Sequence, residues 1–400
     1  MGATAMWRRC LFLLLLLCVS CTPPAPEQPS TNWFPANYDS SRERFRDACA
    51  RLKGLCASWP IPSRTDPGLT IDHGFFSRGG DRLLVIQSGI HGTEAASGAA
   101  VQAFVMDTYL EPLLSQGIDV LLIHALNPWG FKHGRRNDEF NINLNRNFSV
   151  DGSDYRFDNQ DYRRFRRVFE PGGGVGSTWW GSLRGSLGFV NGVIGAGFDT
   201  APLNNGLDNG QYEFPLGINY GGKAPQPQTA FLKQKIAPIL ARNYKKTLYL
   251  DFHTGLGDKD GLAVILGKNP EPAQEQALRS MLGQYRDQGI KITSPSDPKF
   301  FATVGDVIDF VPSLSRHPHS FLAVTMEYGT IGDDTVSQLR SANRIILDNQ
   351  KYNFGCISQR ICNKVDQHTR DMFNPRDKAW RQAVIHKADL VFRALVEKFR

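Results

Sequence analysis

The chain has 400 residues and a formal net charge of +7; 41% of the residues are hydrophobic and 21% are charged. A chain of this length buries a large core, as one large α/β domain or as one domain with insertions. The mild positive charge is scattered along the chain, which excludes a nucleic-acid-binding role on grounds of charge. The one basic cluster, Arg163–Arg167 (RRFRR), predicts a solvated helical face.

The first 20 residues have the pattern of an export signal. Arg8 and Arg9 precede the apolar run Leu11–Leu17, which is too short to span a bilayer. The segment Cys18–Cys21 (CVSC) follows and resembles a bacterial lipobox, the cleavage site of lipoprotein signal peptides. The sequence therefore predicts a lipoprotein signal peptide over residues 1–20.

We expect the mature chain to begin at a lipidated Cys21 and to carry a Pro-rich tether over residues 21–39. The residue after this cysteine is Thr22 rather than an aspartate, which resembles the pattern of lipoproteins sorted to the outer membrane of Gram-negative cells. The expected location is thus the bacterial cell envelope, lipid-anchored at the outer membrane and facing the periplasm. An ordinary cleaved signal peptide with a coincidental cysteine is the alternative. Without Arg8 and Arg9 the net charge falls to +5.

Four cysteines remain in the mature chain besides Cys21. Export permits disulfide bonds. The close pairs Cys49/Cys56 and Cys356/Cys362 are the simplest pairing, although the sequence also allows a cross-pairing.

The periodicity of apolar residues predicts alternating strands and helices in a domain over residues 40–400. The expected strands are Arg82–Ile90, Ile118–Ala125, Thr247–Phe252, Leu262–Gly267 and Phe321–Glu327. Residues 40–57 are expected to contain the start of a helix and an N-terminal lead-in. The other expected helices are Ala95–Leu110, Thr229–Tyr244 with a kink at Pro238, Pro272–Gly289, Val336–Asn349 and Trp380–Phe399. The first strand–helix–strand unit favours a parallel sheet.

Residues 151–223 form a loop-rich insertion in this scheme. Gly172–Gly222 is rich in glycine, asparagine and aromatic residues, and no regular element is apparent there. A stretch of this length without elements is usually functional or an insertion, so we expect it to form a rim beside the functional cleft.

Polar residues stand at the ends of three predicted strands. His91 and Glu94 follow the first strand through Gly89 and open a helix, although a turn with a solvated glutamate is the alternative. Such strand ends are where sites gather in open α/β sheets.

His253 follows the strand Thr247–Phe252, and Asp251 lies two residues earlier, where it can orient a ligand. A core histidine bonded to Asp251 is the alternative here. Glu327 ends a third apolar strand, where an unpaired carboxylate is costly. Two histidines and one carboxylate are the ligand set of a catalytic zinc ion with one position open for water, which predicts a zinc hydrolase.

Arginines between these sites are candidates for substrate binding. Arg136 and Arg146 can each clamp a carboxylate with two hydrogen bonds, a geometry that lysine does not offer. A basic surface loop is the alternative, and Arg135 competes with Arg136 because only their spacing separates them.

Taken in order, these motifs resemble the metallocarboxypeptidase superfamily. They are His91–Glu94 (HGTE), Asn127–Gly130 (NPWG), Asn145–Phe148 (NRNF), His253 and Glu327. The closer resemblance, over roughly residues 65–355, is to a branch catalogued only as a domain of unknown function. It rests on Gly210–Tyr212 (GQY), Tyr220–Gly222 (YGG), Asp251–Gly257 (DFHTGLG) and Val324–Thr330 (VTMEYGT).

The resemblance implies a three-layer α/β sandwich, with a mixed, mostly parallel sheet flanked by helices. It implies one zinc ion per chain, held by His91, Glu94 and His253, with Glu327 as general base. Arg136 would polarise the scissile carbonyl. By the same resemblance, Asn145 and Arg146 would grip the terminal carboxylate of a substrate.

Two positions depart from that superfamily. Asn143 stands where an aspartate usually bonds a ligating histidine, which either lowers zinc affinity or leaves Asp251 to compensate. The usual tyrosine about twenty residues before the glutamate is absent. Tyr212 and Tyr220 are candidates for its place, with local packing as the alternative for both.

Three functions stay open from the sequence. The first is an exported carboxypeptidase that cleaves C-terminal residues of peptides. The second is an acyl-amino-acid amidohydrolase similar to desuccinylases and aspartoacylases, and the third is a lipoprotein without catalysis. No G-x-S-x-G elbow occurs, and Gly172–Ser177 lacks the lysine of a phosphate loop, which argues against serine hydrolases and nucleotide binding. His317 and His319 predict a solvated loop rather than a metal site.

Overall fold

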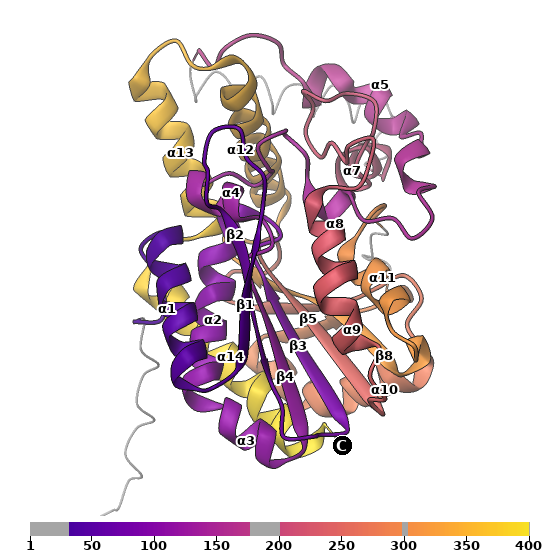
Figure 1. Cartoon of the computed structure of the whole chain (residues 1–400). Coiled ribbons are helices and arrows are strands. Elements are labelled where there is room, and N and C mark those ends of the chain that lie inside the picture. The colour runs from indigo at the N-terminus through magenta and orange to yellow at the C-terminus, as the bar shows by residue number, and fades with distance from the viewer. Residues whose placement is uncertain (1–31, 177–200, 298–302, 400) are drawn as a thin grey trace, which may run out of the picture.

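A computed structural model describes residues 32–176, 201–297 and 303–399 of the chain (Figure 1). The expected signal peptide 1–20 and lipidated Cys21 lie outside these residues, as does most of the expected tether. The first helix begins at Tyr38, two residues before the expected start of the domain.

An eight-stranded sheet forms the centre of the described part, in the order β1-β2-β4-β3-β5-β8-β6-β7. Its strands are β1 (Leu55–Pro60), β2 (Thr70–Phe76), β3 (Arg82–Ser88), β4 (Ile118–His124), β5 (Lys246–Gly255), β6 (Leu262–Leu266), β7 (Ile290–Thr293) and β8 (Phe321–Gly329). The central strands β4, β3, β5 and β8 run parallel, whereas β1, β2 and β6 join by antiparallel ladders.

Helices cover both faces of this sheet and its upper edge in Figure 1. They are α1 (Tyr38–Arg51), α2 (Ala95–Thr108), α3 (Leu110–Ser115), α4 (Pro128–His133), α5 (Gln160–Phe169), α7 (Ala201–Asp208), α8 (Pro227–Phe231), α9 (Ala237–Leu240), α10 (Pro272–Leu282), α11 (Val307–Phe310), α12 (Thr335–Phe354), α13 (Gln359–Phe373) and α14 (Lys378–Lys398).

Side chains along each strand point alternately to the two faces of the sheet, and this divides the core into two layers. On β3, Leu84 and Ile86 face a cluster built with α2, α10 and α14, whereas Leu83 and Val85 face a second cluster built with the α8–α9 segment and α11. Successive side chains of a strand point to opposite faces, so a strand that is apolar throughout must be covered on both sides. The expected three-layer α/β sandwich is therefore confirmed.

The five expected strands correspond to β3, β4, β5, β6 and β8, but β1 and β2 at the edge of the sheet were not predicted. The segment after α1 was expected to be helix or lead-in up to residue 57, yet β1 begins at Leu55 and β2 follows it. Both strands lack a long apolar run, since β1 is largely exposed and β2 carries Asp72 and His73 at its centre. Pairing with the neighbouring strands, rather than local pattern, holds them in the sheet.

The expected helix Thr229–Tyr244 is interrupted as the sequence indicated. A π-helical segment, Leu232–Ile236, separates α8 from α9, and Pro238 is the second residue of α9. Proline lacks the backbone N–H that an α-helical ladder needs at this point, which accounts for the break. The basic cluster Arg163–Arg167 lies on α5, where Tyr162 and Phe165 are buried and the arginines are exposed, as predicted.

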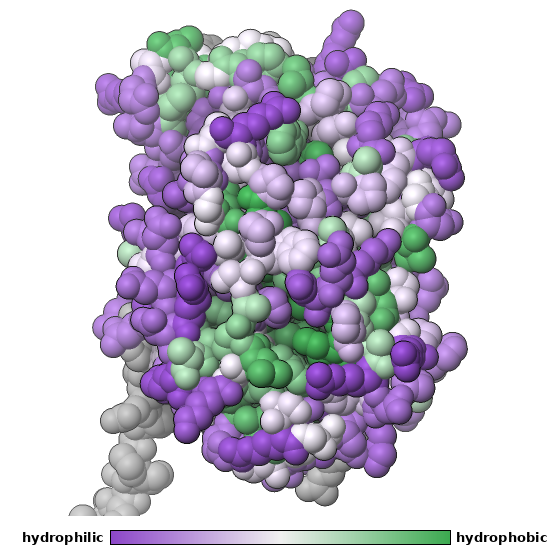
Figure 2. Space-filling model, in the orientation of Figure 1, coloured by the Kyte–Doolittle hydropathy of each residue, from purple (hydrophilic) through white to green (hydrophobic). Residues whose placement is uncertain are grey.

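Disulfide bonds join Cys49 to Cys56 and Cys356 to Cys362, which confirms the simplest pairing. The surface in Figure 2 is mostly hydrophilic, and hydrophobic side chains gather in a hollow in the lower half of the view, over the strands. Among the described residues, no helix combines the length and the apolar character needed to cross a membrane.

Asp138, in the loop after α4, makes the stability of the fold depend on pH. Its Oδ1 accepts hydrogen bonds from the amides of Phe140 and Ile142, both at 2.8 Å. Burial nevertheless raises its pKa from 3.8 to about 7. The folded chain thus holds a proton that the unfolded chain has already lost between pH 4 and 7, so this contribution to stability falls as the pH rises through that interval.

We expect Asp138→Asn to remove that dependence, because an amide oxygen can accept both backbone bonds without carrying a charge. The measured quantity is the unfolding free energy of the variant minus that of the wild type. This difference should be larger at pH 7 than at pH 4 by roughly 1–3 kcal/mol, since each pKa unit corresponds to about 1.4 kcal/mol. Urea unfolding at both pH values measures it. A difference between the two proteins that does not change with pH would contradict the assignment.

Candidate metal centre

The carboxyl ends of three neighbouring parallel strands bring the predicted polar residues together. His91 follows β3, His253 lies near the end of β5, and Glu327 lies near the end of β8. In the ladder between β5 and β8, His253 is directly opposite Glu327. Parallel strands end at the same edge of the sheet, which is why residues that are 74 to 236 positions apart along the chain meet here.

Glycine allows the turn that carries His91. After β3 the chain reverses at Gly89 with a φ of +68°, a conformation that glycine adopts without strain. His91 then precedes a short 3-10 helix, Gly92–Glu94, that leads into α2. A Cβ atom on Gly92 would lie 2.0 Å from the carbonyl carbon of Gly130, so only glycine fits between this turn and α4.

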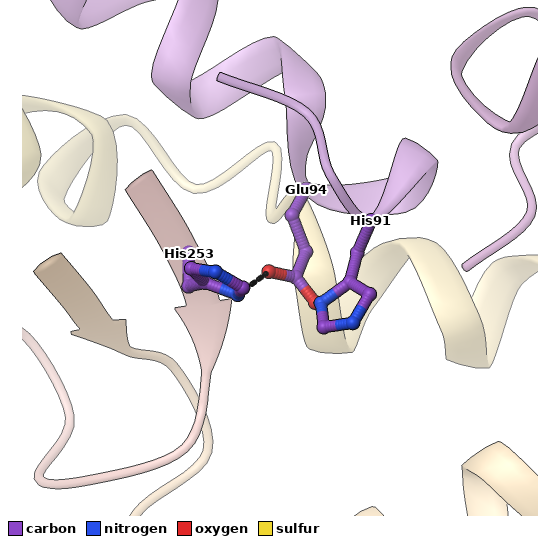
Figure 3. A group of neighbouring side chains, drawn as sticks. All are labelled: His91, Glu94 and His253. Carbon is purple, nitrogen blue, oxygen red and sulfur yellow. Dashed lines mark ion pairs between the residues drawn. The ribbon is translucent and has the colours of Figure 1, made fainter. Parts of the chain in front are cut away.

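His91, Glu94 and His253 converge on one point, and their ligand atoms all lie within 4.8 Å of one another (Figure 3). Nδ1 of His91 is 2.9 Å from Oε1 of Glu94, and Nδ1 of His253 is 3.2 Å from Oε2. All three side chains are at least 96% buried. The convergence predicted from the sequence is therefore present.

Each histidine is held by a hydrogen bond on its far nitrogen. Nε2 of His91 is 2.9 Å from Oδ1 of Asn143, and Nε2 of His253 is 2.8 Å from Oδ2 of Asp251. An oxygen acceptor at Nε2 favours a proton there, so that in the neutral ring the lone pair of Nδ1 points toward the centre. Asn143 thus takes the position of the usual aspartate, and Asp251 serves the other histidine instead of compensating for it.

Burial and charge set the protonation of the three groups. Burial, together with the charge of Arg136, lowers the pKa of His91 to about 3. Burial opposes protonation of His253 as well, but the carboxylates of Asp251 and Glu94 raise its pKa well above the usual value. Burial also opposes ionisation of Glu94, and the two histidines outweigh it and hold the pKa below its usual range. Glu94 is therefore ionised and His91 neutral, whereas a metal ion would bind Nδ1 of His253 only by displacing the proton that the two carboxylates favour there.

This donor set fits a divalent metal ion. Two imidazole nitrogens and one carboxylate are the protein ligands of many catalytic zinc ions. Nδ1 of His91 is buried and has no hydrogen-bond partner of acceptable geometry in the described part of the chain, despite its short distance to Glu94. A buried nitrogen left without a partner is costly, and coordination to a metal ion would satisfy it.

Glu327 lies beside this centre. Its Oε1 accepts a hydrogen bond from the amide of Leu256 at 2.9 Å, and within the described residues no hydrogen bond forms to Oε2. Burial and the nearby charge of Glu94 raise the pKa of Glu327 to about 7. One oxygen is thus fixed by the backbone, while the other is available to a substrate or to water.

The structure separates the two neighbouring arginines that spacing left open. Nη1 of Arg135 forms a buried ion pair with Asp348 on α12 at 2.6 Å, so this side chain points away from the metal centre. Arg136 points toward the centre, with its Nε 3.9 Å from Oε1 of Glu94. Arg136 is therefore the arginine that can reach a bound substrate.

The side chains of Arg146 and Asn145 form hydrogen bonds with other groups of the protein. Arg146 donates to two backbone carbonyls, those of Asp208 at 2.9 Å and of Asn145 at 2.7 Å. No carboxylate of the described residues forms an ion pair with it, so its charge stays available to an anion. The side chain of Asn145 binds Asp306 and the amide of Val307, which fastens the start of α11. Its predicted contact with substrate stays a prediction.

The two tyrosines of the insertion have structural contacts. Tyr212 donates a hydrogen bond to the carbonyl of Arg146 at 2.6 Å, and Tyr220 packs in the core against α8 and its neighbours. His317 and His319 lie in an exposed loop, as predicted. A contact that the sequence did not indicate is that of Asn219, which bonds Arg136 at 2.8 Å. Its position directly before the motif Tyr220–Gly222 was the one available signal.

A surface cavity of about 660 Å³ lies elsewhere, between α1 and β1, where Arg42, Asp72 and His73 line it. It shares no residue with the metal centre. The ligand geometry, and not the size of a cavity, therefore identifies the candidate site.

Comparisons with known proteins give the following similarities. No curated protein matches the chain. Among solved structures, carboxypeptidase A from Helicoverpa armigera is 14% identical, with a TM-score of 0.46, and the similarity covers 91% of this chain and 81% of that one. A metallo-carboxypeptidase from Burkholderia cenocepacia is 10% identical, with a TM-score of 0.41 and coverage of 80% and 68%. Murein-tripeptide amidase MpaA from Escherichia coli O157 is 15% identical, with a TM-score of 0.34 and coverage of 73% and 91%.

At identities and TM-scores this low, a shared activity does not follow from the likeness. The family comparison is more specific. The family described as "Protein of unknown function (DUF2817)" matches residues 34–387, which is most of the chain. This match confirms the resemblance of the motifs to an uncharacterised branch, and the chain belongs to the DUF2817 family.

Proposed function

We propose that this chain is a zinc-dependent hydrolase, and specifically a carboxypeptidase that removes C-terminal residues from peptides. The observation that carries the proposal is the arrangement of His91 and His253, whose Nδ1 atoms both face Glu94 while Asn143 and Asp251 hold their Nε2 atoms. Nδ1 of His91 is buried without a hydrogen-bond partner among the described residues, and coordination to a metal ion would satisfy it.

His91, Glu94 and His253 would hold the zinc ion. When bound there, zinc supplies Lewis acidity that makes a water molecule acidic enough to act as a nucleophile near neutral pH and that polarises a carbonyl.

The side chains around the centre divide the remaining work. Glu327 would take the proton of the attacking water with its unbonded oxygen and deliver it to the leaving amine. Arg136 would donate a hydrogen bond to the carbonyl oxygen as negative charge develops on it. Arg146, whose charge no carboxylate of the described residues neutralises by an ion pair, would bind the terminal carboxylate of the substrate.

The cellular location is part of the proposal and rests on the sequence of residues 1–30. The lipobox-like Cys18–Cys21 and the Pro-rich tether support an exported chain anchored through a lipid on Cys21. A hydrolase at that address meets peptides of the cell envelope.

A panel of substrates tests the carboxypeptidase proposal with the zinc-loaded wild-type protein. It contains peptides with a free C-terminus, the same peptides with an amidated C-terminus, and N-acyl amino acids. We expect hydrolysis of the free peptides and a loss of at least about 100-fold in kcat/KM on amidation, because the ion pair with Arg146 disappears. Preferential release of free amino acids from N-acyl amino acids would replace the peptidase assignment with an amidohydrolase.

A further inference from the structure

Asn219 joins the metal centre to Arg136 through a single side-chain oxygen. Its Oδ1 accepts one hydrogen bond from Nη1 of Arg136 and one from Nδ2 of Asn143, both at 2.8 Å. Its own amide donates to the carbonyl of Leu207 at 2.6 Å. The residue is 5% exposed and belongs to the insertion 151–223, which the sequence predicted to form a rim beside the cleft.

The contacts of Asn143 extend this link to a metal ligand. Oδ1 of Asn143 receives Nε2–H of His91, while its Nδ2 donates to Asn219. An uninterrupted series of hydrogen bonds therefore runs from His91 through Asn143 and Asn219 to Arg136. An aspartate at position 143 would present a carboxylate oxygen to Oδ1 of Asn219, and two acceptors repel one another. The amide at position 143 and the amide at position 219 thus fit each other.

The backbone holds Asn219 in place independently of its side chain. Its φ is +52°, a left-handed conformation that asparagine tolerates better than most residues. Its carbonyl accepts a hydrogen bond from the amide of Gln211 at 3.0 Å, and the neighbouring carbonyl of Tyr220 accepts one from Asn143 at 2.8 Å. A change of the side chain therefore need not displace the segment.

Arg136 has few other constraints. Among the described residues, the bond to Asn219 is the only hydrogen bond of its guanidinium, and its buried Nε has no partner. The nearest carboxylate is Glu94, at 3.9 Å. Without the bond to Asn219, the guanidinium would move toward Glu94 and form an ion pair with it, because a buried charge without an opposite charge beside it is costly. That pair would occupy a carboxylate that the metal ion needs.

We propose that Asn219 is a positioning residue that holds Arg136 in reach of the substrate and away from Glu94. The proposal rests on the function proposed above. It assigns two effects to one side chain: Asn219 preserves the metal affinity of the centre, and it orients the donor that stabilises the reacting carbonyl. The insertion would thereby contribute to catalysis without touching the substrate.

The test compares two glycine variants of the full mature chain. Asn219→Gly removes the side chain and keeps the left-handed backbone free of strain. Asn141→Gly is the matched control: Asn141 is also buried, has a φ of +62°, and ties down the same insertion through the carbonyls of Pro215 and Gly217. It bonds Arg135 and not Arg136. Zinc affinity by chelator competition, kcat and KM on a peptide substrate, and thermal unfolding are measured for both.

We expect Asn219→Gly to weaken zinc binding by about 10-fold, which is in the range seen when a contact behind a metal ligand is lost. We expect kcat to fall by roughly 100-fold, with KM changed far less, as for loss of an oriented donor in the transition state. Asn141→Gly should lower the unfolding temperature and leave zinc affinity and kcat near the wild-type values. Asn219→Asp, which keeps an acceptor oxygen for Arg136, should fall between Asn219→Gly and the wild type in both measurements.

Wild-type zinc affinity and kcat in Asn219→Gly would overturn the proposal. Equal losses in the two glycine variants would also overturn it, because they would show a general loosening of the insertion. If the wild type binds zinc but hydrolyses no peptide, the carboxypeptidase proposal fails, and zinc affinity alone still decides the role of Asn219. A wild type that binds no zinc would overturn both proposals.

Discussion

The replacement Glu327→Gln is expected to reduce kcat by about 1,000-fold or more while zinc binding remains as in the wild type. General base catalysis by a positioned side chain contributes typically 10²–10⁴-fold, and glutamine cannot accept the proton. The amide oxygen of glutamine can still accept the hydrogen bond from Leu256, so the fold of the loop should persist. Steady-state kinetics and the zinc content per chain measure the two parts of this prediction.

A second variant on the same strand serves as the control. Thr325 lies two residues earlier on the same face of β8 and is 8% exposed, compared with 9% for Glu327. Thr325→Val keeps the shape of the side chain and removes a polar group, so it reports the effect of altering the strand itself. We expect a far smaller loss of kcat than for Glu327→Gln. Equal rates for Glu327→Gln and the wild type would remove Glu327 from the mechanism.

Loss of a metal ligand should have the second large effect. We expect His91→Ala to weaken zinc binding by more than about 100-fold, because a lost ligand costs more than a lost contact behind a ligand, which already costs 10–100-fold. Zinc should raise the unfolding temperature of the metal-free wild type but not that of His91→Ala, since an ion that binds only the folded state stabilises it by mass action. Isothermal titration and thermal unfolding with and without zinc test both expectations.

Another buried histidine provides the control for this variant. His124 is 1% exposed at the end of β4, and burial lowers its pKa to about 3, close to that of His91. Its ring contacts Ser41 and Gln102 and not the metal centre. His124→Ala should therefore destabilise the fold and retain zinc. Retention of tight zinc binding by His91→Ala would contradict the assigned ligand set.

The convergence of His91, Glu94 and His253 could be predicted because the signals that mark these residues are local. An apolar run of strand length precedes His253 and another precedes Glu327, and a turn with two glycines carries His91. The geometry of parallel sheets does the rest, since such strands end at one edge. The disulfide bonds were predictable for a similar reason, because each joins cysteines only six or seven residues apart.

The contacts around the ligands could not be predicted in the same way. Arg135 and Arg136 are adjacent and chemically identical, and the ion pair of Arg135 with Asp348, over 200 residues away, holds it away from the centre. The partner of Asn145 is Asp306, the residue that precedes α11. Such pairs depend on the positions of distant segments in the folded protein, and no sequence pattern within one segment predicts them.

The amino-acid sequence by itself determined the class of fold, the family and the three residues that converge as candidate metal ligands, because strand periodicity and strand-end polarity are properties of short segments. Tertiary structure alone decided which nitrogen of each histidine faces the centre and which arginine reaches it. It also decided that Asn219 of the insertion lies behind both His91 and Arg136. Hydrogen bonds between segments far apart in the chain form only after the sheet has brought its edge together, and they depend on atomic positions that a linear pattern does not contain.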